Sequence, residues 1–100
     1  MTKRSLPSTQ VLITEVCSEL NNFLLDKNEK YGDSAIDPVR ILSKADPVEQ
    51  IKVRIDDKLS RLAHGQDGDE DVIKDLTGYL ILLEVAKRKK EQMNGELDPL

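Results

Sequence analysis

Residues 71–90 read DVIKDLTGYLILLEVAKRKK and carry the strongest structural signal in the chain. On a helix, the run Tyr79–Leu83 is apolar on every side, and Val85 and Ala86 continue the pattern. A helix that is apolar all round is buried all round. We therefore expect one face of this helix to pack on the chain's own core, and Ile81 and Val85 to contact another subunit.

Two Asp-Pro pairs mark the starts of two helices upstream. Asp37-Pro38 predicts a short helix through Lys44, because aspartate is a good N-cap and proline suits the first helical position. Asp46-Pro47, with Glu49 three residues after the cap, predicts a longer helix that ends at Gly65. The residues that this longer helix is expected to bury are Val48, Ile51, Ile55, Leu59 and Leu62.

The first helix is predicted from about Ser8 to Lys27, and the last from about Asp69 to Lys90. The first has one broad apolar face, made of Leu12, Ile13, Val16, Cys17, Leu20, Phe23 and Leu24. The sequence thus predicts an all-α, four-helix protomer with one short helix, in a single domain (8–93) between a leader (1–7) and a tail (94–100). A core this small is marginal, so we expect an oligomeric helical bundle. Alternatively, the short helix covers the outer face of the last one.

The chain has 100 residues and a formal net charge of −4, and residues 67–75 alone carry five acids and one lysine. This acidic balance argues against nucleic-acid binding. No apolar run reaches the roughly 18 residues that span a membrane, and the N-terminus lacks the pattern of a signal peptide. The single cysteine, Cys17, cannot form an internal disulfide. We expect a protein of a reducing cytoplasm.

Carboxylates border the apolar faces of the first and last helices. Glu15, Glu19 and Asp26 form one stripe on the first helix, while Asp75 falls inside the apolar arc of the last helix with Asp71 beside it. Carboxylates are rare on buried faces unless something compensates them. If the helices pack through their apolar faces, these acids would form one wall of a pocket.

A cationic flank on the third predicted helix would form the opposite wall, through Arg54, Lys58 and Arg61. Such a pocket suits a polyanion bound through Mg²⁺, because carboxylate oxygens hold the ion and cations neutralise the phosphates. The same arrangement could orient a water for attack on phosphorus without a protein nucleophile.

Each of these features also has a simpler explanation. The acids at 67–71 suit a helix N-terminus, Asp75 could form a structural ion pair with Lys58 or Arg54, and the cations could pair within their own helix. Cys17 fits a core position, and His64 fits a helix cap or the surface. An EF-hand is excluded, because Val72 and Gly78 stand where its glycine and its bidentate glutamate are needed; the start of that pattern is Asp67–Asp71.

Three segments together resemble a known family: Lys27-Asn28 with Tyr31-Gly32-Asp33, RIDDKLSRL at 54–62, and EDVIKDLTGYLILL at 70–83. They resemble the nucleotide-modification-associated domain proteins of phages and bacteria, which are similar to the all-α nucleoside triphosphate pyrophosphohydrolases of the MazG type. The resemblance implies a dimeric or tetrameric bundle in the bacterial cytoplasm that cleaves a nucleoside triphosphate to monophosphate and pyrophosphate. It also implies metal ligands at Asp71 and Asp75, phosphate contacts at Lys58 and Arg61, and a nucleotide pocket at 27–32.

The leading hypothesis is therefore a Mg²⁺-dependent nucleotide pyrophosphohydrolase-like protein, in which Mn²⁺ could replace Mg²⁺. Its expected metal ligands are Glu19, Asp71 and Asp75, and Glu15 would position water. Its expected phosphate-binding residues are Arg54, Lys58 and Arg61, and its nucleotide-binding residues are Lys27, Asn28 and Tyr31, with Tyr31 stacking on a base. The alternatives are a non-catalytic helical module that binds a nucleotide or a protein partner, and a purely structural oligomer.

Overall fold

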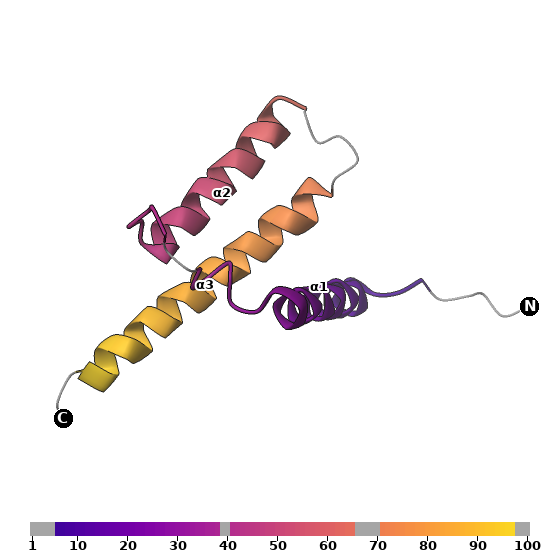
Figure 1. The fold of residues 1–100 in the computed structure, drawn as a ribbon. Coiled ribbons are helices and arrows are strands. Elements are labelled where there is room, and N and C mark those ends of the chain that lie inside the picture. Colours follow the sequence, from indigo (N-terminus) through magenta and orange to yellow (C-terminus); the bar gives the residue numbers. More distant parts are fainter. Residues whose placement is uncertain (1–5, 39–40, 66–70, 98–100) are drawn as a thin grey trace, which may run out of the picture.

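The computed structural model describes residues 6–38, 41–65 and 71–97. All the regular secondary structure in these ranges is helical, in the order α1 (Thr9–Tyr31), α2 (Pro47–Ala63) and α3 (Val72–Leu97). Helices α2 and α3 lie side by side as an antiparallel pair, and α1 crosses α3 (Figure 1). The predicted all-α class is therefore confirmed, with three helices in the described ranges.

Helix α2 begins where the sequence predicts and ends at Ala63, two residues before the predicted end at Gly65. The Asp46 carboxylate accepts a hydrogen bond of 2.8 Å from the Val48 amide, and Pro47 occupies the first turn. The residue that caps its C-terminal end is His64, whose ring nitrogen Nδ1 lies 2.7 Å from the carbonyl oxygen of Ser60. His64 is thus an exposed cap residue, as expected. Capping at both ends fixes the length of α2 and so the reach of its cationic side chains.

The core lies between α2 and α3. Its buried residues are Ile36, Ile51, Ile55 and Ala86, with Val48, Leu76, Tyr79, Leu82, Leu83 and Val85 packed against them. Ile51 and Ile55 are buried as predicted, whereas Leu59 is 47% exposed and so does not reach this core. Val85 packs on the chain's own core, while Ile81, the other residue assigned to a subunit contact, is exposed.

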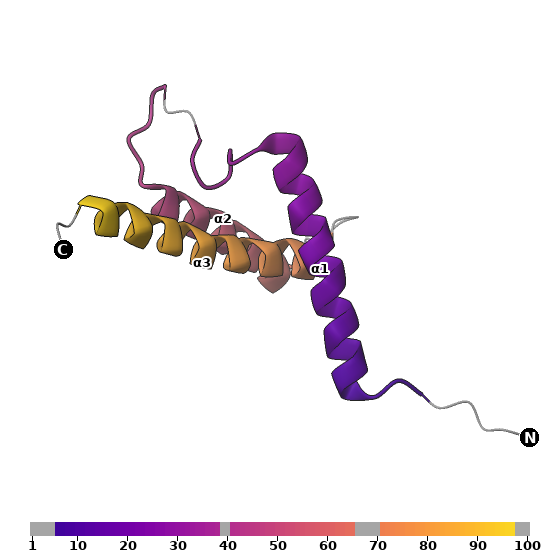
Figure 2. The same cartoon turned by 90° about the horizontal axis from the view of Figure 1, so that it is seen from below.

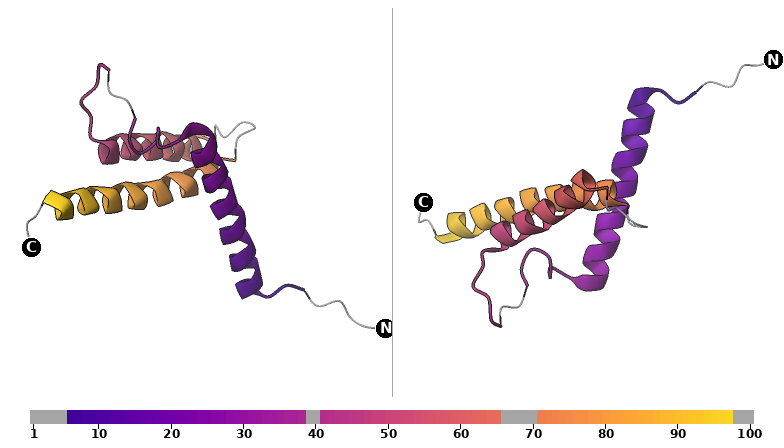
Figure 3. Two further views of the ribbon diagram at one scale, coloured as in Figure 1. Left: turned by 60° about the horizontal axis from the view of Figure 1, so that its bottom comes forward. Right: turned by 90° about the horizontal axis from the view of Figure 1, so that it is seen from above.

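Helix α1 is capped by Ser8, whose hydroxyl accepts from the Val11 amide at 3.2 Å, and it ends before Gly32. Helix α1 packs against α3 but not against α2, and no residue of α1 is buried. It extends well beyond the hairpin of α2 and α3 (Figures 2 and 3). Cys17, expected in a core, is exposed on α1.

The short helix predicted from Asp37-Pro38 to Lys44 is not formed in the described residues of that segment, where the chain is bent or extended; residues 39–40 lie outside the description. A helix of two turns needs tertiary packing to be stable. Here Ile41 and Leu42 are 86% and 97% exposed, so no apolar contact holds the segment helical. It therefore does not cover α3 as a helix.

Candidate functional site

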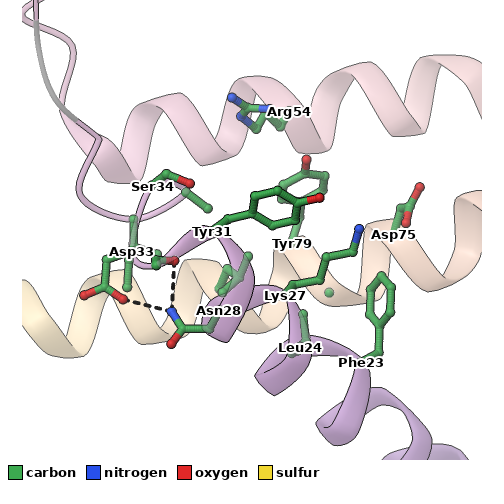
Figure 4. A pocket seen from close by; sticks show the side chains of 15 residues that line it. Phe23, Leu24, Lys27, Asn28, Tyr31, Asp33, Ser34, Arg54, Asp75 and Tyr79 are labelled. Carbon is green, nitrogen blue, oxygen red and sulfur yellow. Dashed lines mark hydrogen bonds between the residues drawn. The ribbon is translucent and has the colours of Figure 1, made fainter.

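A cavity of about 410 Å³ lies where α1 and the turn after it meet α2 and α3 (Figure 4). Helix α1 supplies one wall and the hairpin of α2 and α3 supplies the other. The residues that line it are Phe23, Leu24, Lys27, Asn28, Tyr31, Gly32, Asp33, Ser34, Ala35, Ile36, Arg54, Asp75, Gly78, Tyr79 and Leu82. The predicted nucleotide-binding residues Lys27, Asn28 and Tyr31 thus share one cavity with Arg54 and Asp75.

Aromatic rings are concentrated at this cavity. The chain has one phenylalanine, two tyrosines and no tryptophan, and all three rings line the cavity. Phe23 and Tyr79 are half-buried, whereas Tyr31 is 63% exposed at the end of α1. Aromatic faces are the usual platform for stacking a planar ligand. The cavity therefore has the character of a binding site for a flat molecule.

Cationic groups lie over these rings. The Lys27 ammonium is 5.4 Å from the centroid of Phe23 and 5.6 Å from that of Tyr31. The Arg54 guanidinium lies 6.0 Å from the Tyr79 ring, from the opposite wall. Contacts of this kind hold a cation over the ring face while its charge stays available to an anion.

The carboxylates of the cavity are paired. Asp75 Oδ2 lies 3.6 Å from Lys58 Nζ, and the two side chains are 31% and 13% exposed. Asp33 Oδ2 accepts from Lys89 at 3.0 Å. In the described part of the chain, by contrast, neither Lys27 nor Arg54 forms an ion pair with a carboxylate, so the cavity presents uncompensated positive charge.

The turn after α1 forms the end wall of the cavity. Gly32 has φ 63°, a conformation that favours glycine, and it directs the chain back toward α3. The Asn28 side chain donates to the Gly32 carbonyl at 3.1 Å and to Asp33 Oδ1 at 2.9 Å. The Asn28 hydrogen bond and the Lys89 ammonium hold the pKa of Asp33 below its ordinary value of 3.8. Asn28 therefore shapes the wall in addition to facing the ligand space.

A second, smaller hollow of about 250 Å³ lies between α1 and the start of α3. Glu19 and Asp71 both line it, together with Lys74. The Asp71 carboxylate accepts from the Lys74 amide at 3.0 Å, which is the capping role open to an acid at a helix start. The other acids of the predicted patch, Asp67, Asp69 and Glu70, lie outside the described residues.

The predicted metal ligands do not meet within one chain. Glu19 and Asp71 line the smaller hollow, whereas Asp75 lines the larger cavity and pairs with Lys58. Across the described ranges, no group of three or more His, Cys, Asp or Glu residues is close enough to hold a metal ion. One protomer therefore does not form the Mg²⁺ ligand set, and metal binding at these positions stays a prediction.

The predicted phosphate-binding residues also divide. Arg54 lines the cavity, Lys58 pairs with Asp75, and the Arg61 Nε atom lies 3.5 Å from Asp57 one turn away on α2. Glu15 is exposed on α1 and lines neither hollow. Of the three cations expected on α2, only Arg54 lines the cavity, and Lys27 of α1 is the second cation that lines it.

Phe23 and Tyr79 are site residues that sequence patterns did not single out, because aromatic residues at helical spacing are usually core residues. The sequence feature that could have indicated them is the small number of aromatic residues. The chain has only three aromatic rings, and all three line this cavity. The sequence indicates Asp33 only as part of a family motif. Its role as the anchor of the turn needs the fold, because Lys89 is 56 residues away.

No family model matches the chain, and no curated protein or solved structure matches it. None of the described helices is long and apolar enough to span a membrane. The resemblance to nucleotide-modification-associated domain proteins therefore depends on the sequence segments that suggested it.

Proposed function

We propose that the protein binds a nucleotide in the cavity between α1 and the α2–α3 hairpin. The observation that carries the proposal is that all three aromatic rings of the chain surround a cavity that also holds two cations without ion-pair partners in the described ranges. A nucleotide combines a flat base with an anionic phosphate, so it matches both properties at once. A purely apolar ligand would leave the cations unused.

The size and the charge of the cavity support a mononucleotide. A volume of about 410 Å³ falls within the roughly 300–1,000 Å³ typical of small-molecule sites. Tyr31 is the natural stacking surface because it is exposed at the cavity mouth. Lys27 and Arg54 approach from opposite walls and so can hold a phosphate between them. Asn28 and Ser34 supply polar contacts at the end wall.

The proposal is tested by calorimetric titration of the full chain with AMP, ATP and ribose 5-phosphate in the presence of EDTA. We expect saturable binding of the nucleotides and weaker binding of ribose 5-phosphate. Tyr31→Ala should weaken nucleotide binding about tenfold, because stacking on one base contributes about 1–3 kcal/mol. No nucleotide binding at millimolar concentration would contradict the proposal.

A matched pair of lysines provides the control. Lys27 lines the cavity, whereas Lys30, on the same helix, pairs with Asp26 at 3.3 Å and does not line it. Lys27→Ala should weaken binding of nucleotide and of ribose 5-phosphate alike, and Lys30→Ala should leave both unchanged. If the two substitutions weakened binding equally, the affinity for the ligand would depend only on the total charge of α1 and not on the cavity.

We propose Mg²⁺-dependent pyrophosphohydrolysis of a nucleoside triphosphate as the second candidate, in the homo-oligomer that the sequence predicts. The observation that favours it is that Glu19 and Asp71, two of the three expected ligands, line one hollow. Incubation with a panel of dNTPs and Mg²⁺ should release pyrophosphate, and Glu19→Gln should abolish the release. Nucleotide binding without pyrophosphate release would leave the non-catalytic module as the function.

A further inference from the structure

Two successive contacts join α2 to α3 beside the cavity. The Arg54 guanidinium lies 6.0 Å from the centroid of the Tyr79 ring, and Lys58 Nζ lies 3.6 Å from Asp75 Oδ2. Arg54 and Lys58 are four residues apart on α2, and so are Asp75 and Tyr79 on α3. Residues at this spacing are neighbours on one helix face, about 6 Å apart along the axis. The Asp75 carboxylate therefore lies about one helical turn from the arginine to which the proposed function assigns a phosphate.

The Asp75 carboxylate is held in this position. Its partner Lys58 has a side chain that is only 13% exposed, and a poorly hydrated ammonium keeps an anion beside it. The Asp75 side chain is itself 31% exposed, so water screens its charge only in part. The carboxylate also lines the cavity, where it repels any anionic group that is placed next to it.

The positive part of the cavity has a carboxylate on each side. Among the described residues, the cations that line the cavity are Lys27 and Arg54, and the carboxylates are Asp33 and Asp75. Figure 4 shows Asp33 at the left and Asp75 at the right, with both cations between them. Asp33 is held by Lys89 at 3.0 Å, as Asp75 is held by a lysine of α2. The space that favours an anion is therefore bounded by negative charge in both directions.

We propose that the cavity selects a nucleoside monophosphate over the corresponding diphosphate and triphosphate, and that Asp75 determines this selectivity. The inference rests on the proposed nucleotide binding. A phosphate monoester carries about −1.5 to −2 charges at pH 7, which the two cations of the cavity match. Each further phosphate adds negative charge beyond what these cations compensate. A phosphate chain that extends past Arg54 toward the start of α3 also approaches the Asp75 carboxylate, and such juxtaposition of like charges weakens binding.

Calorimetric titration of the full chain with AMP, ADP and ATP in EDTA tests the selectivity. AMP should bind about tenfold more tightly than ATP, with ADP between them. Asp75→Asn should raise the affinity for ATP about fivefold more than the affinity for AMP, because it removes the repelling charge. If Asp75 were only structural, its loss would change both affinities by the same factor.

The matched control is Asp57→Asn, which removes an exposed carboxylate of α2 that does not line the cavity. It should leave the ratio of the AMP and ATP affinities unchanged. ATP binding as tight as AMP binding in the wild type would overturn the proposed selectivity. A ratio that Asp75→Asn leaves unchanged, or that both substitutions change equally, would overturn the role of Asp75.

A second measurement depends neither on a folded variant nor on a base. Inorganic phosphate and tripolyphosphate are titrated into the wild-type chain in EDTA, and tripolyphosphate should bind no more tightly than phosphate. Tighter binding of tripolyphosphate would overturn the inference, whatever the nucleotides do. A chain that binds AMP, ADP and ATP equally would contradict the inference and leave the proposed function standing. A chain that binds none of the three nucleotides would contradict both.

Discussion

Asp75 is the residue at which charge, packing and ligand binding meet. It lines the cavity as a carboxylate, yet its partner is Lys58, whose side chain is only 13% exposed. An ammonium this poorly hydrated depends on a nearby anion. The inward position of Asp75 that suggested a metal ligand is therefore explained, within one chain, by the need to compensate Lys58. The carboxylate also opposes the binding of a phosphate beside it.

Asp75→Asn is expected to lower the free energy of unfolding by about 1 kcal/mol. This loss is larger than that from breaking an exposed ion pair and smaller than that from breaking a fully buried one. The same change should strengthen nucleotide binding several-fold in EDTA, because it removes a negative charge from the cavity. Urea denaturation and calorimetric titration measure the two effects.

The control for this prediction is Asp57→Asn, which removes the carboxylate near Arg61 in a pair whose side chains are 58% and 39% exposed. It should change stability by less than about 0.5 kcal/mol. If Asp75→Asn stabilised the protein and abolished Mg²⁺-dependent hydrolysis, the ion pair would not be the main role of Asp75.

Acid should loosen the turn that closes the cavity. The Asn28 hydrogen bond and Lys89 lower the pKa of Asp33, so the charged form is favoured in the folded protein. A lowered pKa contributes stability above the unfolded value, and this contribution is lost as the pH falls through the folded value. We therefore expect loosening only below about pH 4, near the ordinary pKa of an aspartate.

Side-chain carboxyl NMR titration of Asp33 measures this effect directly. Asn28→Ala should raise the pKa of Asp33 toward its ordinary value, because the largest single cause of the shift is removed. Lys89→Ala should also raise it, because that change removes both a hydrogen bond and a positive charge. An unchanged pKa in Asn28→Ala would show that the turn is held in another way.

At the scale of the helices, the cavity exists because α1 crosses α3 at a glycine. A Cβ at Gly78 would lie 3.2 Å from Leu24 Cδ2, the end of a flexible side chain. Gly78→Ala should therefore be accommodated by a small shift of Leu24 and should gain about 1 kcal/mol of helix propensity. Gly78→Leu should instead displace α1 from α3 and weaken nucleotide binding at least tenfold. Calorimetry with circular dichroism distinguishes the two variants.

Local signals predicted both α1 and α2, and of these two helices only α2 also has the buried face that the sequence predicts. Asp46-Pro47 and Ser8 cap α2 and α1, and Ile51 and Ile55 face the core. Asp37-Pro38 carries the same kind of start signal, but Ile41 and Leu42 find no apolar neighbour and no helix follows in the described residues. A cap can start a helix, whereas packing decides whether a short one persists.

The site was predictable only in part. Lys27, Asn28 and Tyr31, which the sequence assigns to a nucleotide pocket, line one cavity together with Arg54 of α2. The angle at which α1 crosses α3 is not encoded in either helix alone, and it determines that Glu19 and Asp71 lie in one hollow while Asp75 lies in another. Wheel diagrams give the face of each residue but not which faces meet.

At the scale of the whole molecule, the core is small because α1 contributes no buried residue to it. The buried residues lie at the α2–α3 pair and the turn at Ile36, so α1 adds surface without adding buried volume. In the homo-oligomer that the sequence predicts, a second chain would add buried area to this small core. Folding and association should then be linked.

This linkage predicts a melting temperature that depends on protein concentration. For two-state unfolding of a dimer to two chains, mass action favours the dimer as concentration rises. With an unfolding enthalpy of about 0.7 kcal/mol per residue, each tenfold increase should raise Tm by about 3–4 °C. Scanning calorimetry from 10 µM to 1 mM measures this slope. A concentration-independent Tm in the wild type would mean that α1 is stable without a partner.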